Sequence, residues 1–591
     1  MVIIYSMLTW ILIGLLFGLF SGLLMEYKNT PKGYKKIVSN MKEAEDKRHS
    51  ILRDGFNKRK IPENLDAIII GSGIGGLSLG AFLSRVGKKV LVLEQHYIAG
   101  GCCHAFDEGG YEFDTGIHYI GNFQKRKSIL DFITDKKLEW DQLGREDDKK
   151  VYDEIVIGQN RYPLRAGKEN IIADLKRWFP TQKDAIDEYF YLVTKIANKD
   201  LHFVSKVIQN KLLKKIIKTF FCIDYYLYAN MTASQVIDKI ITNKDLKAVL
   251  TAQFADYGCS PAKISFAMHC GVVNHYLEGG YYPRGGSNSI AEKIIPVIEK
   301  SGGRVLVRKA VKSVLVENNM AYGVEMENGE KVYAKKVISD AGIRNTLNNL
   351  LPPGSMPEEY YKLLEEVKPS ISYFYSFIGL KGSQKELNLP SRNFWVFPNI
   401  DMDNVIEEFG KDPIHFPHRP PMFIVFPSAK DSKWDTRFPE KSTALVLSIL
   451  PYELFEKWQD EKCMKRDEEY NELKNAIGER LIKEGLLKFY PELEDKIEYK
   501  NFATALTNKH YLNTDYGECL GLDHCDKRFT SDILEPVTPI KNFYFTGQDI
   551  ATGGFAGGLV GGLLCANSVL GYGTIMDILL NKDLIKDLEK I

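Results

Sequence analysis

The sequence has almost no net charge, few cysteines, and no repeat or low-complexity segment. Its 78 Lys and Arg residues are balanced by 77 Asp and Glu residues, so the formal net charge of the 591-residue chain is +1. Without a basic surplus, nothing indicates nucleic acid as a partner. Nine cysteines, an odd number without a Cys-x-x-Cys pair, do not suit a disulfide framework. Cys519, His524 and Cys525 lack ligand spacing, and we expect no metal site.

Charged side chains are also missing from Val2 to Met25, a stretch rich in Leu, Ile and Phe. It is long enough to cross a bilayer as a helix. We expect residues 1–25 to be an uncleaved membrane anchor, with a signal peptide as the alternative, although no basic residue precedes the stretch. The lysines that follow it favour a cytoplasmic position for the body of the protein. Residues 26–61 then form a polar linker.

A glycine-rich loop between two expected strands is the most informative motif. A buried strand over 67–70 runs into Gly71, Gly73, Gly75 and Gly76, a helical pattern follows, and a second strand ends at Glu94. The glycines permit a tight turn and a close approach to a pyrophosphate, which binds the unpaired N–H groups at the helix N-terminus. An acidic residue about 20 positions on can bind a ribose. This order of elements predicts a dinucleotide site, which continues into Gly100 and Gly101.

Two later regions favour FAD over NAD. Residues 303–315, 321–326 and 331–338 carry β-patterns separated by Asn-rich and Asn-Gly turns. Near the C-terminus, a strand over 542–549 contains Gly547 and ends at Asp549, and a helix is expected over 563–570. Asp549 can meet a ribityl hydroxyl, and the helix start can stabilise negative charge on a reduced flavin. The alternative is a C-terminal helix that only packs on the sheet.

These motifs, together with the segments 113–121, 282–287 and 546–550, resemble the retinol saturase-type flavoproteins of the carotenoid isomerase and phytoene desaturase group. The resemblance implies FAD, with the backbone of Val311 near the adenine. It also implies reduction of one double bond of all-trans-retinol to the 13,14-dihydro product at the endoplasmic reticulum membrane. The glycine-rich stretch 553–562 departs from the family pattern and is expected to reshape the pocket beside the flavin.

The expected fold is therefore α/β: a Rossmann-type FAD-binding domain with an inserted α+β substrate domain, preceded by a membrane helix. We assign residues 62–140, 281–355 and 536–576 to the FAD-binding domain. Residues 141–280 and 356–535 form the substrate and membrane-facing domain, and 577–591 a C-terminal tail.

Reduction of a C=C bond needs a proton donor as well as the hydride that a flavin supplies. His104, Asp114, His118 and Tyr119 follow the second strand and are expected near the flavin ring. The two histidines are the catalytic candidates because imidazole titrates near neutral pH. The alternative is that these side chains only fix loop geometry.

Three residues of the segment Tyr282-Pro-Arg-Gly-Gly are further cofactor candidates. Arg284 can contact a flavin phosphate or take part in a surface ion pair, and the second role is the more common one for such a residue. Gly285 and Gly286 would let the backbone approach the cofactor.

Residues 206–221 carry five lysines without an acid, interleaved with large apolar side chains. This pattern suits a helix on an anionic membrane surface, or equally the solvated face of an ordinary amphipathic helix. NAD(P)H is one candidate electron source. Because a second dinucleotide loop is not visible, an electron-donor protein is the other. The competing functions are a polyene isomerase or desaturase, and a non-catalytic isoprenoid-binding protein of the GDP-dissociation-inhibitor type.

Overall fold

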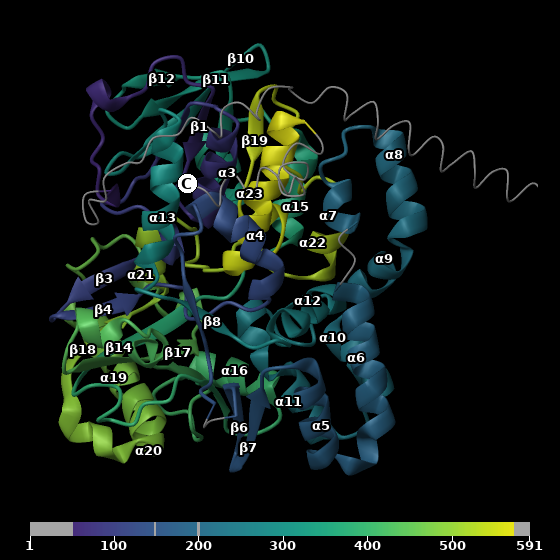
Figure 1. Ribbon diagram of the computed structural model, residues 1–591, viewed down its shortest axis with the longest axis vertical. Coiled ribbons are helices and arrows are strands. Elements are labelled where there is room, and N and C mark those ends of the chain that lie inside the picture. Colours follow the sequence, from purple (N-terminus) through teal and green to yellow (C-terminus); the bar gives the residue numbers. More distant parts are fainter. Residues whose placement is uncertain (1–50, 147–148, 198–200, 572–591) are drawn as a thin grey trace, which may run out of the picture.

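The computed structural model describes residues 51–146, 149–197 and 201–571. Two large sheets lie towards opposite ends of the long axis, and helices pack around both (Figure 1). The expected membrane segment 1–25 and the tail 577–591 lie outside the described residues. Within the described ranges, the structure has no helix that is long and apolar enough to cross a membrane.

The first sheet is parallel, in the order β19-β13-β1-β2-β9. Alternate residues of its central strands face two different hydrophobic cores. One core contains three helices, and the other contains a three-stranded antiparallel sheet, so both faces are covered as a parallel sheet requires. This arrangement confirms the Rossmann-type prediction. The strands are β1 (Ala67–Ile70), β2 (Val90–Leu93), β9 (Arg304–Leu306), β13 (Val337–Ser339) and β19 (Phe543–Phe545), the helices α3 (Ile74–Arg85), α13 (Asn288–Lys300) and α23 (Gly554–Leu570), and the covering strands β10 (Val311–Glu317), β11 (Met320–Met326) and β12 (Lys331–Tyr333).

Two segments differ from the expected boundaries. The β-pattern over 303–315 is divided between β9 and β10, which belong to different sheets, and Arg308 between them has a positive φ of 62°. The last helix begins at Gly554, nine residues before the expected start. Periodicity missed these residues because five of them are glycines, which carry no apolar signal.

The second sheet has seven strands in the order β18-β14-β17-β16-β15-β6-β7, all antiparallel except the pair β15 and β6. It forms one side of a second body of the molecule, with helices α5, α6, α10, α11 and α12 beside it (Figure 1). The strands are β6 (Val151–Ile157), β7 (Asn160–Arg165), β14 (Tyr373–Lys381), β15 (Asn393–Phe397), β16 (Met422–Val425), β17 (Lys441–Ile449) and β18 (Ile497–Ala503).

Two small strand pairs join the bodies. The hairpin β3 (Ala105–Glu108) with β4 (Tyr111–Asp114) lies between the two large sheets, and β5 (Trp140–Gln142) pairs with β8 (Tyr281–Pro283). The remaining helices include α4 (Phe123–Thr134), α5 (Lys168–Trp178), α6 (Lys183–Ala197), α10 (Ala233–Ile240), α11 (Lys244–Thr251), η7 (Ala252–Tyr257), α12 (Phe266–Tyr276), α15 (Glu358–Glu366), α16 (Met402–Lys411), α17 (Pro427–Lys430), α18 (Trp434–Arg437), α19 (Glu468–Leu481), α21 (Ala505–Leu512) and α22 (Asp526–Thr530).

The lysine-rich stretch 206–221 is not one continuous helix. After α7 (Leu201–Ser205), the chain turns, and the side chain of Asn210 caps α8 (Lys211–Ile216) by accepting from the N–H of Leu213. A π-helical turn η6 (Ile217–Phe221) then leads to α9 (Ile223–Ala229). The capping residue is the local reason that the helix begins at 211.

Candidate functional site

One cavity of about 1700 Å³ runs between the two bodies of the molecule. Ordinary ligand pockets have volumes of about 300–1,000 Å³, so this cavity has room for a dinucleotide and an apolar ligand together. Its lining changes along its length. Glycine backbone and carboxylates of the first sheet form one end, and aromatic side chains of the second sheet form the other.

The glycine end lies at the carboxyl edge of the parallel sheet, where β1 meets α3. Gly71 has a φ of 101°, a left-handed conformation that favours glycine, and Gly73 caps α3 through its backbone. A Cβ on Gly75 would lie 2.6 Å from the Cα of Gly547, so only glycine allows these two loops to meet. The N-terminus of α3 therefore opens onto the cavity between two glycine loops, which suits a pyrophosphate.

Glu94 lies at the same edge, at the end of β2. One carboxylate oxygen accepts from the N–H and O–H of Ser72, at 3.1 and 2.6 Å, and the other accepts from the N–H of His96 at 2.9 Å. An ionised carboxylate offers about four acceptor positions. The side chain is thus held in one orientation with one acceptor position left for a ligand hydroxyl.

Asp549 and the start of α23 close the other side of this groove. The two carboxylate oxygens of Asp549 each accept one backbone N–H, from Ile343 and Leu522, at 2.9 Å. The first N–H groups of α23 are bound inside the protein, that of Gly553 by His524 Nε2 at 2.7 Å. The sequence predicts that the start of this helix faces the flavin ring. The N–H groups that come after Gly553 and Gly554 would then have this role.

Asp340, which directly follows β13, faces the centre of the groove. Its carboxylate accepts from the N–H of Gly76 at 2.7 Å, and it lies so close to Gly75 that a Cβ there would be 2.3 Å from Oδ1. The pKa of Asp340 is raised to about 8. Burial is the main cause, and the negative charges of Asp549 and Glu94 act in the same direction.

Ten of the residues selected from the sequence line this one cavity, and five do not. The lining residues are Gly71, Gly73, Gly75, Glu94, Gly101, His104, His118, Val311, Gly547 and Asp549. Gly76 lies just behind the groove, where its N–H binds Asp340, and the N–H of Gly100 binds the hydroxyl of Ser72 at 3.1 Å. The other three are Arg284, Gly285 and Gly286.

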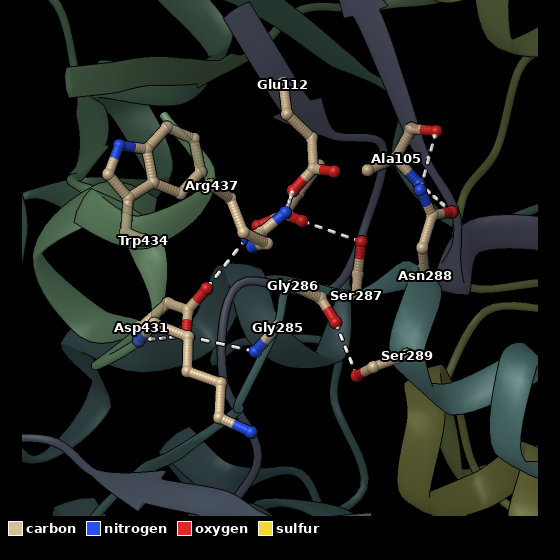
Figure 2. A network of polar contacts seen from close by, with 12 residues as sticks. Ala105, Glu112, Gly285, Gly286, Ser287, Asn288, Ser289, Asp431, Trp434 and Arg437 are labelled. Carbon is tan, nitrogen blue, oxygen red and sulfur yellow. Dashed lines mark hydrogen bonds and ion pairs between the residues drawn. The ribbon is translucent and has the colours of Figure 1, made fainter. Parts of the chain in front are cut away.

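Gly285 and Gly286 belong to a polar network away from the cavity lining (Figure 2), and Arg284 also lies outside that lining. The guanidinium of Arg284 binds Asp141, with its closest nitrogen at 2.7 Å, so of the two alternatives it makes the ion pair rather than a phosphate contact. The N–H of Gly285 donates to Asp431 at 3.0 Å. A Cβ on Gly286 would lie 2.7 Å from Glu112, so its glycine serves packing against that carboxylate and not approach to a cofactor.

This network fastens the start of α13 to the second body of the molecule. Figure 2 shows Arg437 between Glu112 and Asp431, with both ion pairs at 2.7 Å. Asp114 is buried in the same region and accepts from Tyr282 and Ser287. It holds these hydroxyls and does not line the cavity, which favours a role in loop geometry over acid catalysis.

The two catalytic candidates line the cavity, but burial favours the neutral imidazole form of both. The pKa of His118 is lowered to about 3. Burial is the main cause, and the positive charge of Lys430 acts in the same direction. Burial also lowers the pKa of His104, whose Nδ1 lies 2.5 Å from the carbonyl of Gly101. Because an imidazolium is needed for a histidine to act as a general acid, the electrostatics argue against both as the proton donor.

Aromatic rings form the far end of the cavity. Trp395 and Phe423 on β15 and β16 lie with ring centroids 4.1 Å apart, and Tyr375 and Phe377 of β14 stack at 5.7 Å. Tyr119 stacks on Tyr276 at 4.5 Å and on Phe423 at 6.2 Å. Such a lining suits a long, flat, apolar ligand.

Comparisons with known proteins identify the family of this chain. Residues 69–135 match the family model of the NAD(P)-binding Rossmann-like domain. The chain is 40% identical to the all-trans-retinol 13,14-reductase of Danio rerio over 88% of this chain and 89% of that protein. It is 37% identical to the Homo sapiens protein of that name over 94% and 93%. The chain belongs to the all-trans-retinol 13,14-reductase family.

Other proteins are less similar to this chain. A Danio rerio protein named inactive all-trans-retinol 13,14-reductase is 33% identical over 92% of both chains, and a prolycopene isomerase of Daucus carota is 26% identical over 85% and 80%. Among solved structures, cyclohexylamine oxidase from Brevibacterium oxydans shares the fold, with a TM-score of 0.54 and 15% identity over 86% of this chain and 99% of that one. The resemblance to this oxidoreductase group is thereby confirmed.

Two carboxyl groups of this family member escaped the sequence analysis. Asp340 had a readable signal, since an acid directly after a strand of a parallel sheet lies at the ligand-binding edge. Asp256, on η7, faces the aromatic end of the cavity. No local pattern marks it, because its partners come from residues more than 100 positions away.

Proposed function

We propose that this chain is an FAD-dependent reductase that saturates the 13,14 double bond of all-trans-retinol. The observation that carries the proposal is the single cavity joining a glycine-lined nucleotide groove to an aromatic chamber in a member of the retinol 13,14-reductase family. A cofactor and an apolar polyene that share one cavity can come into contact without passing through water. Hydride transfer requires this direct contact in a site from which water is excluded.

The residues present fit FAD along the groove. The glycine edge at α3 would hold the pyrophosphate, Glu94 the adenosine ribose and Val311 the adenine. Asp549 and the start of α23 would hold the ribityl chain and the ring. Once bound, the flavin supplies the hydride, and the protein orients the substrate and keeps water out.

An isomerase is the second candidate, supported by the prolycopene isomerases among the relatives. It would use the same groove and chamber without net reduction. The retinol reductases are preferred because their identity to this chain is 37–40%, against 26% for the Daucus carota isomerase.

The test is anaerobic and measures product. Purified protein is reduced with dithionite, mixed with all-trans-retinol, and followed by its visible spectrum and by chromatography of the retinoid. Reoxidation of the flavin with formation of 13,14-dihydroretinol supports the proposal. A cis/trans shift without loss of conjugation supports the isomerase. Protein that purifies without flavin contradicts the proposal. Protein that holds flavin but does not turn over also contradicts it, and one relative is named as inactive.

The electron source is proposed to be external, either NAD(P)H or an electron-donor protein. The described groove is continuous with one dinucleotide-type glycine loop and would hold one dinucleotide. Addition of NADPH or NADH to the oxidised protein separates the cases, because only direct transfer bleaches the flavin without a second protein.

We also propose that the protein lies on the endoplasmic reticulum membrane through the outer surface of α8, η6 and α9. Leu212, Phe220, Ile223 and Leu227 are each between 59% and 70% exposed on this surface. Adjacent residues of the same region, among them Val207 and Tyr225, line the cavity. An apolar surface beside the cavity suits a lipid bilayer from which a dissolved retinoid can enter.

The lysines of this region contribute less to the docking surface than their number suggests. Lys206 is buried and donates to the carbonyls of Leu534 and Ile550, both at 2.9 Å. Lys214 and Lys218 bind Glu535 and Asp532. Since three of the five ammonium groups face inward, we expect membrane contact to depend on apolar burial more than on anionic lipid.

A double variant tests this surface. Phe220→Ser with Leu227→Ser should slow transfer of all-trans-retinol from phosphatidylcholine vesicles into the full-length protein about tenfold, and leave reduction of detergent-dissolved retinol unchanged. Tyr333→Ser removes a similarly exposed ring on β12 and should leave both rates unchanged. Equal transfer by the double variant and the wild type would exclude this surface. Fractionation against an endoplasmic reticulum marker tests the location.

A further inference from the structure

A cluster of buried polar groups lies at the aromatic end of the cavity. Tyr119 Oη lies 3.0 Å from Oδ2 of Asp256 and 3.0 Å from Oδ2 of Asp153. Asp256 lines the cavity, whereas Asp153 lies behind it on β6. The cluster thus connects a carboxyl group that faces the substrate chamber to one that does not.

Counting hydrogens shows that one of the two carboxyl groups must be protonated. A phenol has a single O–H hydrogen and can donate to only one of its two carboxyl neighbours. The phenol oxygen and the oxygen of the other carboxyl group are also 3.0 Å apart, and the hydrogen between them has to come from that carboxyl group. The arrangement is therefore a chain of two hydrogen bonds that contains one carboxylic acid and one carboxylate.

The surrounding donors assign the proton to Asp256. Asp153 accepts from Gln253 at 2.7 Å and from Asn393 at 2.8 Å, and a third N–H comes from Trp395 at 3.1 Å. Three N–H donors stabilise a charged carboxylate. Asp256 is therefore the acid, which donates to Tyr119, while Tyr119 donates to Asp153.

The electrostatics agree with this assignment. Burial, together with the smaller effect of the negative charge of Asp153, raises the pKa of Asp256 to about 7. The other groups that face Asp256 are Tyr119, Tyr276 and Lys430, and all three act to lower this pKa. The pKa of Asp153 stays lower, at about 6, in spite of its complete burial.

We propose that Asp256 is the proton donor of the reduction, an inference that rests on the proposed function. Asp256 transfers its carboxyl proton to the carbon next to the one that receives the hydride. The π electron pair of the C=C bond forms the new C–H bond to this proton. The hydride from the reduced flavin brings the second hydrogen and two electrons. The flavin becomes oxidised in this step.

The transfer leaves Asp256 as a carboxylate that regains its proton from water between turnovers. Tyr119 is a positioning residue, because its hydroxyl links Asp256 to the fixed charge of Asp153. Two other carboxyl groups that line the cavity also have pKa values raised mainly by burial, Asp340 to about 8 and Glu518 to about 7. Glu518 accepts a backbone N–H from Tyr516 and lies near Asp549, so it belongs to the nucleotide end and serves as the comparison residue.

The first test measures protonation and needs no turnover. Infrared difference spectra of the flavin-loaded protein between about pH 5.5 and about pH 8.5 should show loss of a protonated carboxylic acid band as Asp256 ionises. Asp256→Asn should remove this band, and Glu518→Gln should leave it in place. A spectrum in which Asp256→Asn leaves every band unchanged overturns the proposal.

The second test measures chemistry in the reduced holoenzyme. Asp256→Asn should lower the rate of flavin reoxidation by all-trans-retinol about 10²-fold or more, with flavin content and retinol affinity, from fluorescence quenching, within about threefold of the wild type. The wild-type rate should fall above pH about 7, because the acid must be protonated. Tyr119→Phe should shift this pH midpoint without removing the activity, and Asp256→Glu should restore part of the rate.

The outcomes separate this inference from the proposed function. A wild-type protein that reduces another polyene but not retinol contradicts the substrate, and the variants are then compared on that polyene. If the wild type reduces retinol while Asp256→Asn is as fast and Glu518→Gln is slow, Asp256 is not the donor. If no polyene reoxidises the flavin, the proposed function fails, and the infrared spectra still decide the protonation of Asp256.

Discussion

At the scale of single residues, the nucleotide groove depends on backbone contacts that no side chain can enter. Gly75 shows this most clearly, because a Cβ would lie 2.3 Å from Asp340 Oδ1 and 2.6 Å from Gly547 Cα. Gly75→Ala should therefore lower the stability by about 1–3 kcal/mol, as overpacking does, and reduce the flavin-to-protein ratio. Gly55→Ala meets nothing within 4 Å and should change neither quantity. Thermal unfolding and the absorbance ratio of the purified variants check this, and full flavin retention in Gly75→Ala would contradict it.

Asp340 should make the stability of the flavin-free protein fall with rising pH. Its pKa is raised from 3.8 to about 8, so the unfolded chain loses this proton at lower pH than the folded protein. Between about pH 4 and 8 the folded state binds more protons, and the free energy of unfolding decreases as pH rises.

Asp340→Asn keeps an acceptor for Gly76 and cannot ionise. Its melting temperature relative to the wild type should increase from pH 5 to pH 8, by an amount equivalent to about 1–3 kcal/mol after allowance for partial exposure. Asp66→Asn is the matched control of opposite sign, because hydrogen bonds from Lys335 and Lys89 outweigh its burial and lower the pKa of Asp66. An Asp340→Asn difference that does not vary with pH would disprove the assignment.

Residue roles could be predicted where a motif is local and could not where the partners are distant. Glu94 and the glycines are predictable because strand, turn and helix are consecutive, and all but Gly76 and Gly100 reach the cavity. Arg284 is misleading because its partners, Asp141 and Glu139, lie more than 140 positions away. Asp256 stayed unnoticed for the same reason. Its chemistry arises from Tyr119 and Asp153, on other elements.

At the scale of elements, the glycines of α23 explain a departure from the family pattern. A Cβ on Gly558 would lie 2.6 Å from Ile74, and one on Gly562 2.2 Å from Ser78 Oγ. These glycines therefore bring α23 against α3, which shortens the distance between the two helix starts that face the groove. The contacts show that these glycines set helix packing. Gly553, Gly554 and Gly558 also line the cavity, and the expected reshaping of the pocket stays a prediction.

The segment around α7 and α8 depends on one buried lysine. Lys206 donates to the carbonyls of Leu534 and Ile550, and burial lowers its pKa to about 7. Lys206→Met keeps an apolar stem but leaves both buried carbonyls without their donor, which should cost about 1–3 kcal/mol.

The cost should appear as faster amide hydrogen exchange over residues 201–229, because this segment loses its link to the loop before α23. Lys211→Met, on the exposed side of α8, should exchange like the wild type. Unchanged exchange in Lys206→Met would mean that apolar packing alone holds the segment. The role of this lysine was not predictable, since nothing local sets it apart from the other four lysines of 206–221 and its two carbonyl partners lie more than 300 positions away.

At the scale of the whole molecule, each body is assembled from distant parts of the chain. The first sheet takes strands from residues 67–93, 304–339 and 543–545, and the second from 151–165 and 373–503. The order of motifs in the sequence indicates this interleaving, because strand signals for one nucleotide domain recur on both sides of long segments without motifs. The architecture of those segments was not predictable, since their strands pair across more than 200 residues.

This assembly couples cofactor binding to the union of the two bodies. Both bodies line the cavity, so FAD in the proposed groove would contact the first body directly and close the space against the second. A ligand that binds only the folded protein stabilises it by about 2.7 kcal/mol at 100 times its Kd. Without it, the large shared cavity leaves the two bodies held by their small strand pairs and the network around Arg437.

Calorimetry should therefore show one unfolding transition for the flavin-loaded protein and two for the flavin-free protein, because cooperativity is lost between bodies that no longer share a ligand. Added FAD should restore the single transition and raise its midpoint with concentration, whereas FMN, which lacks the adenosine that Glu94 and Val311 would bind, should restore it only partly. Arg437→Met, which breaks the network but not the groove, should widen the separation of the two transitions without changing the flavin ratio. A flavin-free protein that unfolds in one transition at the midpoint of the loaded form would show that the bodies are coupled by their own contacts and that the cofactor is not part of their union.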